Sequence, residues 1–219
     1  MSISHLYALR TPETLPFLWD AIHHQTNYFS ENMASFSPEN LIAAIQAQLI
    51  YVLMRMVAQA TTPANLNYSV MYVFKKLCER FIQTIEEPFC YEPGAGVPRR
   101  WEDWVVGESW RRMKCVFFLV GRVVNVDMGA GVKCMARYAD VNCISLPCGR
   151  ALWEAHSRGE WEEGLMSGGV HRGLATIGAL LDAHRGDIGP GGAGSEALDR
   201  WNVEVDGLGS LLNASLGMV

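Results

Sequence analysis

The sequence predicts an all-α fold: an irregular single domain of six or seven helices that spans residues 1–219. Three observations lead to this prediction. Apolar residues recur every three to four positions in several long segments, which is the period of an α-helix. No segment keeps up the alternation of apolar and polar residues that is typical of a half-buried strand. A chain of 219 residues, 49% of them hydrophobic, is long enough to bury a complete core in one domain.

The start of the chain predicts one short helix. Pro12 and Pro16 favour an extended or turn-like backbone before a helix over residues 17–29. This helix carries His23 and His24, which could be ligands or acid–base groups. Adjacent residues on a helix point about 100° apart, so the two side chains are not expected to serve one site. Both are interpreted as ordinary, partly exposed histidines.

Two long helices are expected next. Ser37 offers a hydroxyl cap and Pro38 suits the first helical position, so a helix should begin there and run to about residue 60. This helix is apolar nearly all round, which predicts neighbours on several sides. A second helix is expected over 66–87, where apolar residues form one stripe and Pro88 follows. Because the connection is short, the two should form an antiparallel hairpin.

A loop rich in proline and glycine precedes the third long helix, which is expected over residues 101–126. One stripe of this helix carries Glu108 and Arg112 among apolar residues. The acid stands four positions before the base, the favourable order for an ion pair, and the apolar neighbours predict partial burial. Removing one partner of a buried pair is expected to cost about 3 kcal/mol. A catalytic role of Glu108 is the alternative, since perturbed acids also occur in active sites.

The C-terminal part is expected to be irregular at first and then helical. Over residues 129–155 no period holds. A capping box formed by Ser157 and Glu160 then predicts a short helix that reaches residue 166. Another helix should end at Gly186, which is placed to act as a left-handed cap. One last helix is expected after Ser195, which offers a cap of its own.

The overall charge argues against a general grip on nucleic acid. The chain has 18 Lys and Arg against 23 Asp and Glu, a net charge of −5 at pH 7, and its longest basic runs are doublets. A protein that holds DNA irrespective of sequence needs a basic face that displaces counterions. We therefore expect no direct DNA binding.

Metal and cofactor sites also find no support in the sequence. The six cysteines include no C-x-x-C pair, so we expect reduced thiols and no metal. The stretch 189–194 matches G-x-G-x-x-G, but a helix rather than a strand is expected before it. It is interpreted as a linker and not as a dinucleotide site. No cofactor is expected.

The sequence predicts an intracellular protein without a membrane partner. Residues 1–10 mix polar and apolar side chains, and no apolar segment with a cleavage site follows. The longest unbroken apolar run of the most hydrophobic segment, Leu49 to Met54, is too short to cross a bilayer.

One ordered set of residues carries more information than these exclusions. The set reads Trp101-x-x-Trp104-x-x-x-Glu108-Ser109-x-Arg111-Arg112, then an apolar helix, then Leu146-Pro147-Cys148-x-x-x-Leu152-Trp153-Glu154-Ala155-x-x-x-x-x-Trp161. It resembles the fungal-specific transcription factor domain, also called the middle homology region, which is the large helical regulatory region of fungal zinc-cluster regulators. The resemblance is strongest over 101–166 and weaker over 41–87 and 197–201.

The chain departs from that family in two respects. The family's zinc cluster needs C-x-x-C pairs beside a basic segment, and this sequence has neither. Family domains also extend further at the N-terminus. The resemblance therefore implies a shortened regulatory domain that stands alone, without its DNA-binding module. The shortened start is expected to leave an apolar face that a second copy, in a homodimer, or a partner protein would cover.

Two classes of function follow from the resemblance. The first is a regulator that binds a small apolar metabolite or a partner protein, is linked to a fungal secondary-metabolite pathway, and works in the nucleus. The alternative is a cytosolic, cofactor-independent enzyme of natural-product biosynthesis, for example a Diels–Alder catalyst or another cyclase or isomerase. A concerted cyclisation needs a shaped apolar pocket and a few hydrogen-bond donors, but no nucleophile or metal.

Aromatic residues with a polar edge suit a mostly apolar metabolite. We expect a ligand pocket between the helices, lined by some of five candidate residues. The candidates are Trp104, Trp110, Tyr51, His23 and His24. The sequence contains no catalytic motif that would assign catalytic residues to the alternative enzyme.

Overall fold

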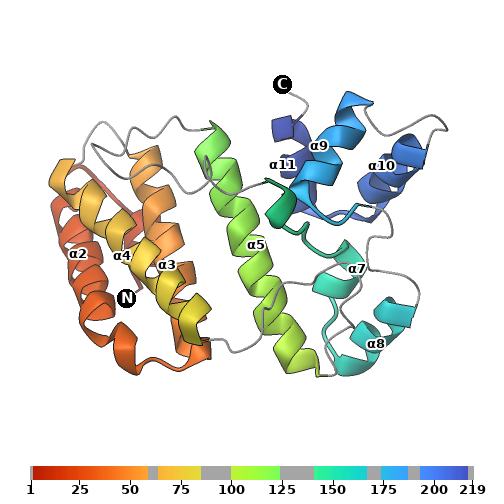
Figure 1. Cartoon of the computed structure of the whole chain (residues 1–219). Coiled ribbons are helices and arrows are strands. Elements are labelled where there is room, and N and C mark those ends of the chain that lie inside the picture. The colour runs from red at the N-terminus through yellow and green to blue at the C-terminus, as the bar shows by residue number, and fades with distance from the viewer. Residues whose placement is uncertain are drawn as a thin grey trace. The chain divides into compact units, whose positions relative to one another are not determined.

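The computed structural model describes residues 2–58, 64–84, 100–123, 141–166, 174–186 and 193–216. These parts of the chain are built from helices and contain no strand (Figure 1). Their one β-type contact is an isolated antiparallel bridge between Ser145 and Thr176. The all-α prediction is confirmed.

The chain divides into two compact units. Unit 1 comprises Met1–Pro88 with Met128–Gly131, and unit 2 comprises Phe89–Asp127 with Val132–Val219. Two compact units can belong to one domain or to two, so the single domain expected from the sequence stays a prediction. Each unit is described by itself.

Unit 1 is a group of helices around a long central pair. Its elements are α1 (Ile3–Ala8), α2 (Leu15–Asn32), the 3-10 turn η1 (Met33–Ser35), α3 (Pro38–Val57) and α4 (Ala64–Thr84). The helix α3 packs against α4, and α2 packs against both of them (Figure 1). Ser37 caps α3 as expected, because its hydroxyl accepts the backbone N–H of Asn40 at 3.3 Å.

The start of unit 1 differs from the extended backbone that the two prolines predict. The segment Ile3–Ala8 forms α1, and the hydroxyl of Ser2 caps it by accepting the N–H of His5 at 3.3 Å. Pro16 stands in the first turn of α2, where a backbone N–H has no partner inside the helix. Pro12 therefore lies between α1 and α2, and Pro16 is accommodated at the start of α2, so neither proline prevents a helix.

A buried polar contact joins three helices of unit 1. Gln48 of α3 donates from Nε2 to the carbonyl of Val70 in α4 at 3.0 Å and to Oγ1 of Thr26 in α2 at 3.2 Å. All three groups lie in the core, where an unmade hydrogen bond costs about 1–3 kcal/mol. This contact fixes the relative positions of α2, α3 and α4 along their axes.

The apolar helix α3 is, by length and composition, the one described helix that could cross a membrane. Its 20 residues meet both criteria, but 56% of the tested stretch is buried in the structure. The central helix of a soluble protein has the same features. The expected lack of a membrane partner stays a prediction.

Unit 2 consists of one long helix and several short ones. Its elements are α5 (Trp101–Val123), η3 (Val141–Cys143), α7 (Arg150–Trp153), α8 (Arg158–Met166), α9 (Ile177–Arg185), α10 (Ala193–Glu204) and α11 (Gly207–Leu216). The helix α11 packs against α5, and α9 packs against α10 and η3 (Figure 1). Trp201 and Leu212 are fully buried members of the larger apolar core of this unit.

Two local signals in unit 2 act as the sequence predicts. Ser157 accepts the N–H of Glu160 at 3.3 Å at the start of α8, and the carboxylate of Glu160 accepts the N–H of His156 at 2.7 Å. Gly186 ends α9 with a φ of 72°, in the left-handed region.

The described residues hold ten α-helices, so the expected number of six or seven is wrong. Seven helices were placed from the sequence, and α1 and α7 are two more. The tenth arises because the last helix, expected to run unbroken, divides at Val205 and Asp206 into α10 and α11. The side chain of Asp206 accepts the N–H groups of Leu208 and Gly209, at 3.0 and 3.1 Å, and so begins a new helix.

Several expectations concern residues outside the described parts of the chain. These are most of the loop before α5, the first half of the connector at 129–155, and the G-x-G-x-x-G stretch up to residue 192. The second half of the connector contains η3 and α7.

The break between α10 and α11 requires a small residue at position 209. A Cβ added to Gly209 would lie 2.5 Å from Cβ of Val205 and 3.3 Å from Cζ2 of Trp201. We expect Gly209→Ala to lower the free energy of unfolding by about 2 kcal/mol, because the new methyl group overpacks the core. Urea denaturation measures the loss.

Gly207 provides the matched control on the same helix. A Cβ there would meet no atom within 4 Å. Gly207→Ala should leave stability within about 1 kcal/mol of the parent or raise it, since alanine favours helix. Equal losses from both substitutions would show that the close approach at Gly209 is not the cause.

Candidate functional site

Three charged residues of unit 2 are buried on one face of the helix α5. Glu108 is 0% exposed, and Arg111 and Arg112 are each 8% exposed. Positions three and four residues apart face the same side of a helix, so the spacing places both guanidinium groups beside the carboxylate. Other positions of this face, among them Cys115, are apolar and buried, so the charged groups are withdrawn from water with them.

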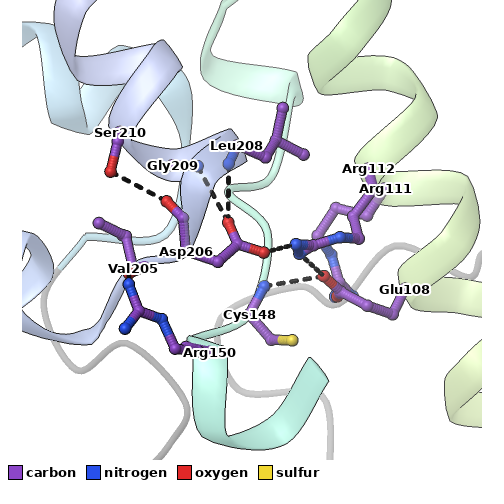
Figure 2. A network of polar contacts seen from close by, with 10 residues as sticks. All are labelled: Glu108, Arg111, Arg112, Cys148, Arg150, Val205, Asp206, Leu208, Gly209 and Ser210. Atoms are coloured by element: carbon purple, nitrogen blue, oxygen red, sulfur yellow. Dashed lines mark hydrogen bonds and ion pairs between the residues drawn. The ribbon is translucent and has the colours of Figure 1, made fainter. Parts of the chain in front are cut away.

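Both oxygens of Glu108 are engaged. Oε2 forms an ion pair with Arg111, and Oε1 accepts the backbone N–H of Cys148 at 2.9 Å (Figure 2). Arg112 is more distant, with its Nη1 3.8 Å from Oε1. The carboxylate therefore ties α5 to the segment before α7, forty residues later in the chain.

The close partner of Arg112 is Asp206, at the break between α10 and α11. In Figure 2 the two side chains point toward each other and form an ion pair. The second oxygen of Asp206 caps α11 through Leu208 and Gly209. One carboxylate thus begins a helix and pairs with a cation from 94 residues earlier.

A second arginine holds the same break. Arg150, the first residue of α7, donates from Nη2 to the carbonyl of Val205 at 3.1 Å (Figure 2). The guanidinium carbon of Arg112 lies 4.1 Å from the ring centroid of Trp153, at the other end of α7. These contacts form what is called the charged network below, and they connect α5, α7 and α11. Its members are Glu108, Arg111, Arg112, Cys148, Arg150 and Asp206.

Burial controls the chemistry of the thiols beside the network. It raises the pKa of Cys115 to about 12, with a smaller contribution from Glu108. Burial also raises the pKa of Cys148, and the negative charge of Glu108 is again the smaller contribution. Desolvation lowers the pKa of Arg112, and the carboxylate of Glu108 opposes this shift. The thiols are therefore neutral near pH 7 and lack the thiolate that a nucleophile needs.

The arrangement suits a structural role better than a catalytic one. Glu108 has no exposed surface, and its oxygens contact groups of the protein itself. An acid or base in a reaction must reach a substrate. Within the described residues, no group of three His, Cys, Asp or Glu could hold a metal ion.

The five predicted ligand residues fall in different units. Tyr51, His23 and His24 belong to unit 1, and Trp104 and Trp110 belong to unit 2. The two histidines are exposed on α2, with His23 3.1 Å from Nδ2 of Asn27, and Tyr51 is buried in α3, where burial raises its pKa. Their common pocket stays a prediction.

The two tryptophans are buried in α5. The ring of Trp104 lies 5.8 Å from that of Trp161 in α8, at a tilt of 52°. This contact joins two residues of the ordered set that carries the family resemblance.

Sequence reasoning paired Glu108 with Arg112 and missed three groups of the network. Arg111 is the closer partner of Glu108, and the N–H of Cys148 and the carboxylate of Asp206 complete the contacts. One local signal was present for Asp206, because an aspartate directly before a glycine and a new apolar run is a favourable helix cap. The spacing of three residues between Glu108 and Arg111 was a second local signal, whereas no local signal marks the contact with Cys148.

Neither a family model nor a curated protein nor a solved structure matches this chain. The resemblance to the fungal transcription factor domain therefore stays a prediction.

The charged network predicts a large effect of removing one partner. We expect Glu108→Ala to lower the free energy of unfolding by about 3–5 kcal/mol, since two buried guanidinium groups lose their shared carboxylate. Arg112→Ala should lower the free energy of unfolding by a similar amount, because the carboxylate of Asp206 loses the cation with which it is paired. Urea denaturation of each variant measures the change.

The ion pair between Arg158 and Glu162 on α8 serves as the control. Its atoms are 2.8 Å apart, but its side chains are 61% and 44% exposed. Arg158→Ala should cost less than about 1 kcal/mol. If the α5 variants unfold at the same urea concentration as Arg158→Ala, the network does not hold unit 2 together.

The buried thiols predict a loss of stability in alkali. Burial raises the pKa of Cys78 and of Cys115 from 9.0 to about 12. Between these values the unfolded chain has released the thiol protons and the folded chain keeps them, so stability falls as pH rises above 9. The loss should be on the order of 1 kcal/mol per thiol and pH unit, measured by urea denaturation at pH 8–11.

Cys115→Ala should make this dependence on pH shallower, whatever it does to stability at pH 7. An unchanged slope in this variant would contradict the assignment to Cys115.

Proposed function

We propose that the chain is a regulatory domain of the kind found in fungal zinc-cluster regulators, and that it binds a small, mostly apolar metabolite. One observation supports this above the others. Residues of the set that carries the resemblance contact one another in unit 2: Trp104 contacts Trp161, 57 positions later, and Glu108 contacts Cys148, 40 positions later. A set that acts together in the core is what a shared domain architecture requires.

The chemistry of the buried groups favours binding over acid–base or nucleophilic catalysis. The acid and the two arginines of α5 contact each other and Asp206, and the neighbouring thiols are neutral. What remains for a ligand in this region is aromatic and aliphatic surface with few polar groups. Such surface suits an apolar molecule.

The catalyst of a concerted reaction is the second candidate. A cyclisation or isomerisation needs an apolar surface that holds one conformer and a donor that stabilises developing charge. Trp161 is the observation that favours it, because its indole N–H is buried, and no partner for it exists among the described residues. The regulator would work in the nucleus, and the enzyme would work in the cytosol.

We propose that the domain acts on transcription indirectly, through a second copy or a partner protein. It would do so without contacting DNA, in keeping with the net charge of −5.

The deciding experiment incubates the pure full-length chain with metabolites made by the enzymes of neighbouring genes. Mass spectrometry follows turnover, and NMR follows binding. We expect saturable binding without turnover, at least about ten-fold weaker in Trp104→Leu because aromatic contact area is lost. Deletion of the gene should lower transcripts of the neighbouring genes.

Val203→Ala, on an exposed position of α10, is the control and should bind as the parent does. Turnover by the parent that Trp104→Leu loses would overturn the regulator in favour of the enzyme. Failure of every metabolite to bind, with unchanged transcripts, would overturn both.

A further inference from the structure

Unit 2 contains a small aromatic cluster separate from its main core. Trp104, Cys148, Leu152 and Trp161 are buried in it, and Trp101, Ala155 and Leu165 are half-buried around them. This set is called the indole cluster. Trp101 and Trp104 share one face of α5, and Trp161 and Leu165 share one face of α8. The half-buried members give the cluster an edge that solvent reaches.

The two most buried tryptophans of unit 2 differ in one respect. Trp201, 1% exposed, donates from Nε1 to Oδ1 of Asn213 at 3.1 Å. Trp161, 2% exposed, has its Nε1 buried with no hydrogen-bond partner among the described residues. A buried indole N–H usually finds an acceptor, and leaving it without one costs about 1–3 kcal/mol. Among the described residues, the indole N–H of Trp161 therefore lacks an oxygen acceptor.

Two polar groups beside the cluster are already engaged. The N–H of Cys148 donates to Glu108, and Glu108 uses its other oxygen for Arg111. Both contacts hold the cluster in place, because they join α5 to the segment that carries Cys148. An apolar cluster whose buried indole N–H has no acceptor among the described residues suits a ligand that supplies one.

The surroundings disfavour an anionic ligand. Residues 100–103 and 150–166 carry six acids and three arginines. Two of these arginines pair with acids of the same stretches, Arg100 with Glu102 and Arg158 with Glu162, and Arg150 binds the carbonyl of Val205. The net negative charge near the cluster would repel a carboxylate or phosphate, so a neutral oxygen is the better acceptor.

We propose that the indole cluster binds a flat, neutral ring system that carries a carbonyl oxygen, and that Nε1 of Trp161 donates its hydrogen bond to that oxygen. The inference rests on the proposed metabolite binding and adds the ligand's chemical class and its anchoring atom. Trp104 and Trp101 supply aromatic surface against the ring.

The test uses two probes that differ only at the proposed acceptor, 1-indanone and indane. Both are titrated into the full-length chain labelled with ¹⁵N, and the indole N–H signal of Trp161 is identified by its loss in Trp161→Phe. We expect 1-indanone to shift this signal saturably and to bind about five-fold more tightly than indane, the value of one neutral hydrogen bond. The signal of Trp201 is the internal control and should not move.

In Trp161→Phe the two probes should bind within about two-fold of each other. If that variant does not fold, exchange of the Trp161 indole hydrogen with solvent replaces it, and 1-indanone but not indane should slow this exchange in the parent chain.

Three results would overturn the inference. Equal binding of the two probes by the parent would show that the carbonyl is not recognised, and the proposed metabolite site would survive. No binding of either probe would exclude this class of ligand at the cluster, while the metabolite experiment would still decide the proposed function. A long-lived water on the indole N–H that persists at saturating 1-indanone would show that water alone is the partner.

Discussion

The carboxylate of Glu108 is the group on whose burial unit 2 depends. A buried ion is tolerated only when opposite charges and hydrogen bonds replace its water. Arg111 lies on the same helix and supplies one contact, but the second comes from the N–H of Cys148, in a segment with no helical period of its own. The need to satisfy this acid therefore brings an irregular stretch of chain to a defined place on α5.

Arg112 has the same need for a partner of opposite charge, and it finds that partner near the C-terminal end of unit 2. Its guanidinium needs a carboxylate, and Asp206 provides it while capping α11. The cap of α11 and the ion pair with Arg112 therefore depend on each other. Any shift of the α10–α11 break that disrupts one also disrupts the other. A buried ionic contact of this kind selects one arrangement among several apolar ones more than it adds stability. The close approach of Gly209 to Val205 strengthens the selection, since no larger residue fits in this arrangement.

Features that depend on a few neighbouring residues could be predicted from the sequence. The cap at Ser37, the capping box at Ser157 and the left-handed Gly186 are read within one or two helical turns. The helix at Ile3–Ala8 was missed because prolines close behind it suggested an extended start. The partner of Arg112 could not be predicted, because 94 residues separate it from Asp206 and the helical spacing offered Glu108 instead. Local periodicity states which face is buried, but not which buried groups meet.

The polar groups buried in unit 2 divide into two kinds, and the division bears on function. Each charged side chain of the network is in an ion pair or hydrogen bond inside the protein, although Nη1 of Arg112 makes no hydrogen bond among the described residues, and the indole of Trp201 also has a partner. Removing one of these partners changes stability rather than recognition. The indole of Trp161 is as buried as that of Trp201 and has no such partner in the part of the chain that the structure describes. Because leaving a buried indole N–H unpaired costs about 1–3 kcal/mol, a ligand that supplies an acceptor would recover free energy that the described residues do not provide. The aromatic residues around it, and not the acids of α5, are therefore where binding should be sought.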